Sequence, residues 1–307
     1  MKTKEYVSRF FLKQHQFRRL TSFSVEEFTL LSEKLERAWK TNEQKRLESR
    51  TDRKRKVGQG RPYVLGDFRN LLFVTILYLR THASIELLAL IFRVDDDTVR
   101  RSVMRVLPLV QDRFIPITAL TKGKKRINDL DELLRAYPEL EDVIFDGTEF
   151  PIQRPKKRQR QSYSGKKKHH TKKSQLALDR KTKLVIGLSP PRKGKIHDKK
   201  HLERIDWDRR LPQKVKRRGD LGYIGMPKDT WIIPHKKPKG KELTQQQKRE
   251  NKKLAKERIY VEHGIRRTKV FRRVGETINV SDHLFSLSLL AATNLANFKW
   301  LVRQGLG

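Results

Sequence analysis

The stretch EDVIFDGTEF, Glu141–Phe150, decides how the fold of this chain is interpreted. Residues 143–145 form a short β-branched and aromatic run, which is typical of a buried strand. The run ends at Asp146, directly before Gly147. An acidic side chain at the end of an apolar strand is poorly suited to a core and well placed to face a ligand. For Asp146 taken alone, an ordinary turn aspartate before glycine is an equally good explanation.

Two later acidic residues follow in different local settings. Asp220 lies in the glycine-flanked stretch RGDLGY after a strand-like segment, and Glu262 lies in RIYVE within a helical pattern. Such a trio suits Mg²⁺, which prefers oxygen ligands. Two such ions about 4 Å apart can activate an attacking oxygen and stabilise a leaving one in phosphodiester chemistry. Because three carboxylates without a cation repel and raise one another's pKa values, clustering would imply metal ions or protons.

Arg258, Glu262 and Lys269 are spaced four and seven residues apart, which puts them on one face of a helix. A carboxylate flanked by cations could hold a metal while the cations bind DNA phosphates. By spacing alone, an ordinary solvated ion-pair face is the better explanation in a chain this charged. Gly264 follows the acid and weakens the helix, so the helix is expected to end or bend there.

A family resemblance adds to this interpretation. The stretches that carry it are FDGTEFPI, YSGKKKHHTKKSQLALD, KGKIHD, RGDLGYIG and RIYVEHGIRRTKVFRR. In these, over about residues 60–300, the chain resembles DDE transposases of bacterial insertion sequences, in the insertion-sequence-five group related to Harbinger-type elements. The resemblance implies an RNase H-like core that binds two Mg²⁺ ions, with Mn²⁺ as a substitute, and that cuts and rejoins DNA.

By position, the resemblance makes Asp146, Asp220 and Glu262 the catalytic, metal-binding triad. It implies that Arg258 and Lys269, which fit the family's arginine–glutamate–lysine spacing, bind DNA. The pair His197 and Asp198 in KGKIHD would lie near the site without being metal ligands. Some relatives have a tyrosine three residues before the arginine, where this chain has Ala255.

The overall charge points to a polyanionic partner. Lys and Arg total 72 against 35 Asp and Glu, giving a net charge of +37, and there is no cysteine. This is the electrostatic footprint of a nucleic-acid binder, although ribosomal proteins and basic membrane-surface proteins share it. The longest apolar region, residues 284–301, is interrupted by Ser, Thr, Asn and Lys, so no membrane span is expected. We expect a cytoplasmic, nucleoid-associated protein.

Four regions are expected along the chain. Residues 1–60 form an N-terminal helical and linker region, in which Ser24 and Glu27 resemble a capping box. Residues 61–115 form a helix–turn–helix domain, 116–140 a linker and 141–307 the catalytic domain. The third helix of the helix–turn–helix would begin near Asp97 and present three arginines to DNA. These are Arg100, Arg101 and Arg105. A plain three-helix bundle is the alternative.

The segment 154–173 contains ten Lys or Arg and no acid. A charge run is usually a solvated loop. Because this one follows the first aspartate directly, contact with the DNA backbone is the preferred interpretation, and such contacts give affinity without sequence choice. The residues expected to contact phosphate are Lys166, Lys167 and Lys168.

The sequence therefore predicts an α+β protein, with an all-α helix–turn–helix domain before an RNase H-like core whose mixed sheet is flanked by helices. The predicted function is that of a Mg²⁺-dependent transposase and endonuclease. It would bind terminal inverted repeats and target double-stranded DNA, work as a homo-oligomer, cleave strands and transfer them. The alternatives are a catalytically inactive, transposase-derived DNA-binding protein and a basic RNA-binding structural protein.

Overall fold

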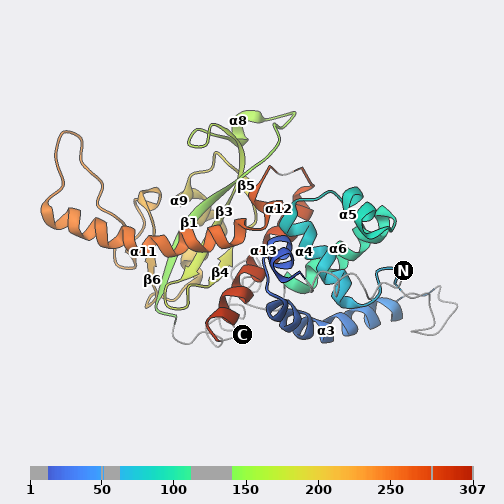
Figure 1. Cartoon of the computed structure of the whole chain (residues 1–307). Coiled ribbons are helices and arrows are strands. Elements are labelled where there is room, and N and C mark those ends of the chain that lie inside the picture. Colours follow the sequence, from blue (N-terminus) through green and yellow to red (C-terminus); the bar gives the residue numbers. More distant parts are fainter. Residues whose placement is uncertain (1–12, 50, 52–62, 112–139, 278, 306–307) are drawn as a thin grey trace. The chain divides into compact units, whose positions relative to one another are not determined.

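A computed structural model describes residues 13–49, 51, 63–111, 140–277 and 279–305 (Figure 1). The chain divides into two compact units. Unit 1 comprises Met1–Phe114, Val270–Val274 and Leu287–Gly307, and unit 2 comprises Ile115–Lys269 and Gly275–Ser286. The predicted linker, residues 116–140, lies outside the described residues except for its last position. The predicted boundaries at residues 60, 115 and 140 stay predictions.

Unit 1 is helical. Its N-terminal helices are α2 (Gln14–Thr21), α3 (Val25–Glu48), α4 (Phe68–Thr81), α5 (Ile85–Phe92) and α6 (Asp96–Gln111). The predicted capping box is confirmed, since Ser24 Oγ accepts from the Glu27 amide at 3.1 Å and the Glu27 carboxylate accepts from the Ser24 amide at 2.9 Å. None of the helices in the described residues has the length and apolar composition that a membrane span requires.

Aromatic side chains fill the core of unit 1. Phe17 stacks on Phe73 with ring centroids 5.7 Å apart and meets Phe28 edge-on at 5.4 Å. Residues 270–274 join this core from far along the chain, because the Arg273 guanidinium lies 3.9 Å from the centre of the Tyr78 ring. The N-terminal helices are therefore packed together with a segment from within the region that the sequence assigned to the catalytic domain.

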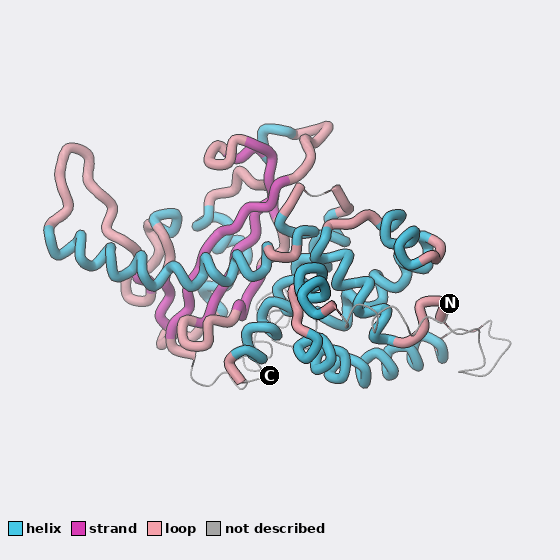
Figure 2. Tube along the Cα trace, in the orientation of Figure 1, coloured by secondary structure: helices cyan, strands magenta, loops and turns pink. Residues whose placement is uncertain are grey.

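Unit 2 is built on a mixed sheet of strand order β4-β3-β1-β6-β7 (Figure 2). β1 (Asp142–Pro151) pairs antiparallel with β3 (His169–Asp179), which pairs antiparallel with β4 (Val185–Leu188). On the other side, β6 (Lys216–Arg218) is parallel to β1, and β7 (Trp231–Ile232) is parallel to β6. Two short strands, β2 (Tyr163–Ser164) and β5 (Arg192–Lys193), also pair with β3.

Helices α9 (Asp198–Ile205), α10 (Trp207–Arg210) and α11 (Gln245–Lys269) belong to this unit, and α11 crosses the sheet (Figure 1). Phe145 packs against Trp207 and Trp231 at ring distances of 6.2 and 5.3 Å. Two short elements, α8 (Gln159–Ser162) and η1 (Leu221–Tyr223), complete unit 2. Most of α12 (Arg272–Gly275) and of α13 (Asp282–Arg303) belongs to unit 1. The mixed α+β class is confirmed.

Helix α11 corrects one expectation. It continues through Gly264 to Lys269, so the predicted end at the glycine is wrong. A Cβ at position 264 would lie 2.8 Å from Leu178 Cδ1 and 3.4 Å from Val185 Cγ2. The glycine therefore allows close packing of the helix on β3 and β4, and tertiary contact outweighs its low helix propensity.

Candidate active site

Asp146 lies in β1, which has a hydrogen-bonded neighbour on each side. Asp146 is half-buried, and desolvation of its carboxyl is the main reason why its pKa is raised to about 6. The charge of Arg258 opposes this rise, whereas the charges of Asp220 and Asp198 add to it. Three carboxylates are therefore close enough to influence one another electrostatically.

Asp220 lies at the same level of the sheet as Asp146. In the parallel pairing of β1 with β6, Ile144 is the partner of Arg218, and each aspartate follows its paired residue by two positions. Asp220 Oδ1 accepts a hydrogen bond from the Gly222 amide at 2.8 Å, which shapes the turn into η1. Parallel neighbours run in the same direction, so these two acids lie at one level of the sheet although they are distant in sequence.

The predicted arginine–glutamate–lysine face lies on α11. Lys269 Nζ donates to the carbonyl oxygen of Glu149 at 2.7 Å. Burial is the main reason why the pKa of Lys269 is lowered to about 8; nearby Lys167 lowers it further, whereas Glu149 and Asp146 oppose the change. Arg258 and Lys269 thus both act electrostatically on Asp146. Glu262 shares their face, but its side chain is exposed and makes no hydrogen bond or ion pair with the described residues.

The neighbours His197 and Asp198 have different surroundings in the structure. His197 is exposed and is the residue before α9, whereas Asp198 begins that helix and faces inward. Lys173 Nζ lies 3.3 Å from Asp198 Oδ1, and Gln175 Nε2 lies at the same distance. Of the two residues, only Asp198 is close enough to Asp146 to affect its pKa.

Three residues around Asp198 were not predicted to lie there: Lys173, Gln175 and Tyr223. Lys173 ends the segment 154–173 that was expected to contact the DNA backbone, and for this residue the expectation is wrong, because it is buried and pairs with Glu149 and Asp198. The Tyr223 hydroxyl donates to Gln175 Oε1, and its ring stacks on Trp231 at 5.3 Å. Burial, with the charge of Asp198 next, raises the pKa of Tyr223 well above its ordinary value. Lys173 and Gln175 are two positions apart in β3, which puts them on one face of the sheet.

Within residues 13–49, 51, 63–111, 140–277 and 279–305, no three His, Cys, Asp or Glu side chains are already grouped as a metal site. The donor chemistry nevertheless fits a hard divalent cation. The pKa of Asp146 is raised mainly by desolvation and further by the charges of Asp220 and Asp198, so a cation would stabilise its charged form, and carboxylate oxygens are what Mg²⁺ prefers. Asp146 and Asp220 could hold such an ion.

The predicted DNA-binding lysines Lys166, Lys167 and Lys168 are exposed in the turn between β2 and β3. The charge of Lys167 lowers the pKa of Lys269, although burial of Lys269 is the larger cause. This basic turn therefore reaches the neighbourhood of the α11 face. The solvated-loop alternative does not require that closeness.

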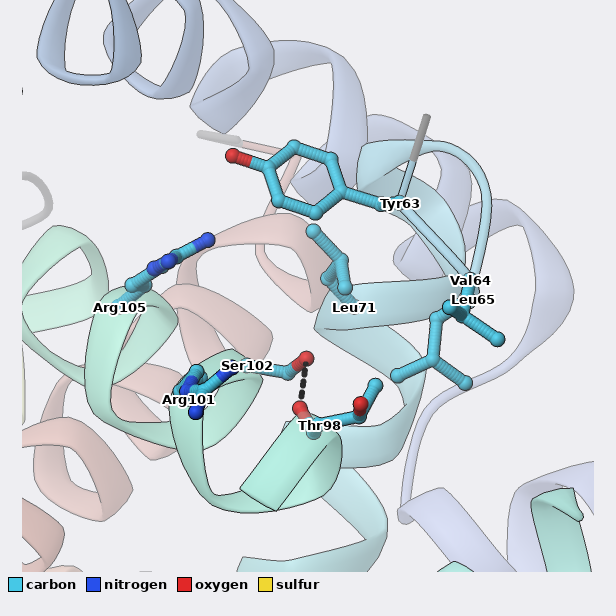
Figure 3. Close-up of a pocket in the computed structure, with 8 residues that line it drawn as sticks. All are labelled: Tyr63, Val64, Leu65, Leu71, Thr98, Arg101, Ser102 and Arg105. Carbon is cyan, nitrogen blue, oxygen red and sulfur yellow. Dashed lines mark hydrogen bonds between the residues drawn. The ribbon is translucent and has the colours of Figure 1, made fainter. Parts of the chain in front are cut away.

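The predicted arginines of unit 1 lie on α6, in two different settings. Arg100 and Arg101 are exposed, and both pair with Asp97, at 3.9 and 3.1 Å. Arg105 is only partly exposed, because it lies 5.4 Å from the centre of the Tyr63 ring in a pocket of about 190 Å³ (Figure 3). The expected outward orientation thus holds for Arg100 and Arg101 and only partly for Arg105.

Comparison with known proteins identifies the family. Residues 145–297 match the family model of the DDE superfamily endonucleases. Over 254 residues the chain is 31% identical to the probable transposase for insertion sequence element IS702 of Microchaete diplosiphon, covering 81% of this chain and 87% of that relative. A solved chain of the Mos1 transposase paired-end complex with left transposon end is 18% identical and covers 64% of this chain and 67% of that chain. Its TM-score of 0.17 is too low for a fold to be inferred. The family match and the insertion-sequence relative show that this chain belongs to the DDE transposases of insertion sequences.

Proposed function

We propose that this transposase binds the terminal inverted repeats of its insertion sequence and catalyses divalent-cation-dependent strand cleavage and strand transfer. The observation that carries the proposal is the pair of acids at one level of the sheet. Asp146 and Asp220 each follow a paired residue of β1 and β6 by two positions, and the pKa of Asp146 is raised mainly by desolvation and further by the charge of Asp220.

An RNase H-like core is part of this proposal. Its support is the order β4-β3-β1-β6-β7, in which the first three strands form an antiparallel set and the last two run parallel to β1. This topology presents the aspartates at the centre of the sheet, and α11 passes over them with Arg258 and Lys269.

Asp146 and Asp220 would hold Mg²⁺, with Glu262 from α11 as the third acid of the triad. Bound Mg²⁺ supplies charge stabilisation on phosphate oxygens and a more acidic water molecule. Two ions, with Mn²⁺ as a substitute, belong to the same proposal. Arg258 and Lys269 would bind phosphates on either side of Glu262, since they share its helix face.

Binding of the DNA backbone is assigned to the basic turn between β2 and β3. Its exposed lysines lie near Lys269 and would contact phosphates close to the scissile bond. Hydrolysis there releases a 3′-hydroxyl, which then attacks the target strand in line. The chain's cationic side chains would hold both DNA segments during these steps.

Recognition of the terminal repeats is assigned to α5 and α6, as a helix–turn–helix with α6 in the major groove. Arg100 and Arg101 are exposed there, and their pairing with Asp97 would be exchanged for contacts with DNA. Assembly as a homo-oligomer on paired DNA ends, in the nucleoid, follows from analogy with transposases in general.

The test is cleavage of labelled DNA that carries the element's terminal repeats, in Mg²⁺ and in EDTA. We expect cleavage in Mg²⁺ only, and its loss in D146N, D220N and E262Q. Glu203→Gln is the matched control, because Glu203 is a half-exposed acid on α9 that pairs with Lys199 outside the site. DNA binding, measured in Ca²⁺, should survive in all four variants.

The rival function, an inactive DNA-binding protein, predicts binding without cleavage by the wild type. A basic RNA-binding protein would bind repeat DNA no better than random DNA. Cleavage retained in D146N or D220N would refute the assignment of the acids.

A further inference from the structure

Arg218 is the last residue of β6, two positions before Asp220, and its guanidinium pairs with acids on two other elements. Its Nε lies 2.8 Å from each carboxylate oxygen of Asp142, the first residue of β1. Its Nη1 donates to Glu257 Oε2 on α11. One side chain thus joins β6 to β1 and to α11, which are the three elements that carry or lead into the proposed catalytic acids.

A second arginine completes this network of four charges. Arg180, in the turn between β3 and β4, lies 2.9 Å from Glu257 Oε1 and 3.5 Å from Asp142 Oδ2. The side chains of Asp142, Arg218 and Glu257 are 10, 12 and 13% exposed, whereas that of Arg180 is 41% exposed. Water therefore reaches Arg180, while the two ion pairs of Arg218 are mostly shielded from solvent.

The network lies on the same face of the sheet as Asp146. Asp142 and Asp146 are four positions apart in β1, so their side chains point to the same face. Arg218 is the partner of Ile144 in the parallel pairing and shares this face. Helix α11 lies there too, because the charge of Arg258 opposes the rise in the pKa of Asp146.

Helix α11 is attached to β1 and its neighbours at two places. Glu257 pairs with Arg218 near the start of β1, and Lys269 donates to the carbonyl oxygen of Glu149, near the end of β1, at 2.7 Å. The helix segment between these attachments carries the rest of the arginine–glutamate–lysine face. A shift at either attachment would move this segment relative to the acid of β1.

The network is better suited to fixing geometry than to stabilising the fold. Burial raises the pKa of Asp142, although both Arg218 and Arg180 lower it. For this carboxylate the loss of hydration therefore outweighs the gain from pairing. A buried ion pair is weak evidence for stability, whereas the planar fork of an arginine fixes the orientation of the carboxylates that it binds.

We propose that Arg218 and Glu257 are positioning residues for DNA cleavage, which hold β1, β6 and α11 at the separation that the catalytic acids require. This inference rests on the proposed function, because it needs Asp146, Asp220 and Glu262 as those acids. In this role neither residue contacts DNA. The plain alternatives are a network that only stabilises unit 2 and arginines that bind DNA phosphates directly.

The first test is single-turnover cleavage of labelled terminal-repeat DNA by the full chain, measured against Mg²⁺ concentration. Since a displacement of about 1 Å costs about a hundredfold in rate, Arg218→Gln should cleave about a hundredfold more slowly. The Mg²⁺ concentration at half-maximal rate should rise about tenfold, as after loss of contacts that orient metal ligands. Affinity for DNA in Ca²⁺ should stay at the wild-type value. Arg218→Lys keeps the charge without the fork and should give intermediate rates.

A neutral network separates positioning from folding. R218Q alone leaves two shielded carboxylates without their main partner, which destabilises the fold. The triple variant D142N/R218Q/E257Q removes all three shielded charges and leaves the more exposed Arg180 to solvent. It should melt close to the wild type, yet cleave slowly with the raised Mg²⁺ midpoint. In the E257Q background, R218Q should cost less than in the wild type, because the link to α11 is already lost.

The second test measures geometry without metal or DNA. Because the chain has no cysteine, Ala255→Cys on α11 and Lys200→Cys on α9 place two nitroxide labels at exposed positions only. Pulsed electron paramagnetic resonance in EDTA then gives the distribution of distances between the labels. We expect a broader or shifted distribution in R218Q and in the neutral network. A wild-type distribution in both would overturn the inference.

Arg217→Met is the matched control. Arg217 is the neighbour on β6, is 2% exposed and points to the other face, where it donates to the carbonyl oxygens of Asp208 and Leu211. Its loss should lower the melting temperature and leave the Mg²⁺ midpoint and the label distances unchanged. If R218Q and the neutral network behave in the same way, their role is only structural and the inference is refuted. Slower cleavage explained by weaker DNA binding in Ca²⁺ would refute it in favour of phosphate contacts.

The triad variants separate failure of this inference from failure of the proposed function. If D146N and D220N abolish cleavage while R218Q and E257Q cleave with the wild-type rate and Mg²⁺ dependence, the positioning role is refuted and the proposed function stands. If the wild type does not cleave in Mg²⁺, or D146N cleaves like the wild type, both are refuted.

Discussion

Gly264→Ala should destabilise the protein even though alanine is the better helix former. Position 264 lies inside α11, where replacing glycine by alanine ordinarily stabilises by about 1 kcal/mol. The structure adds an opposing effect, because the new methyl would lie 2.8 Å from Leu178 Cδ1, well inside the ordinary carbon–carbon contact distance of about 3.5–4.0 Å. Leu178 is fully buried, so it has little room to move.

Overpacking of this kind costs about 1–3 kcal/mol. After the gain in helix propensity, we expect a net loss in the free energy of unfolding of about 1 kcal/mol. The measurement is urea denaturation followed by circular dichroism. Cleavage activity should fall as well, since α11 carries Arg258 and Glu262.

Two further variants isolate the contact. Ala255 is exposed on the same helix, so Ala255→Gly measures the propensity effect without any contact with the sheet. Leu178→Val removes Cδ1, so in that background Gly264→Ala should cost less or become stabilising, with a coupling energy of about 1 kcal/mol or more. A stabilisation of about 1 kcal/mol by Gly264→Ala alone would refute the reasoning, since propensity would then act unopposed.

Three other predictions concern the rest of unit 2. Burial is the main reason why the pKa of His201 falls from 6.5 to about 4, so its neutral form stabilises the fold above pH 6.5. That stabilisation, up to about 3 kcal/mol, should be lost as the pH falls towards 4. Urea denaturation across this range should show the loss in the wild type and not in H201Q; equal pH dependence would refute it. The charged groups that face this imidazole are cationic: Lys173, Arg192 and Arg204. Arg217 is 2% exposed and donates to the carbonyl oxygens of Asp208 and Leu211 at 2.9 and 2.7 Å, so R217M should lower the free energy of unfolding by about 3–5 kcal/mol. A loss below about 1 kcal/mol in urea denaturation would show that these contacts contribute little. A triple change to Gln in the basic turn should flatten the slope of log affinity against log salt by about two to three. The change should be equal for random and terminal-repeat DNA, in binding titrations with Ca²⁺. An unchanged slope would favour the solvated-loop alternative. The three positions are Lys166, Lys167 and Lys168.

Much of the local structure was determined by the sequence alone. The Ser24 capping box, the apolar start of β1 and the helix that carries Glu262 follow from propensities and periodicities that act over a few residues. The expected strand end at Asp146 is wrong, because β1 stays paired with β3 through Gly147 to Pro151. The closeness of Asp146 and Asp220 in the fold was expected only through a family resemblance. Spacing along the chain does not define which strands become parallel neighbours.

Only the tertiary structure decided how the site is assembled. Asp198 has its place because Gly147 and Gly222 leave space for it, and Lys173 with Gln175 holds it there. These contacts link β1, β3, α9 and the turn after β6, so no short-range pattern contains them. The same holds for Gly264, whose low helix propensity is outweighed by packing on the sheet. The sequence indicated which residues are candidates for the chemistry, whereas their distances and burial depend on contacts between segments far apart in the chain.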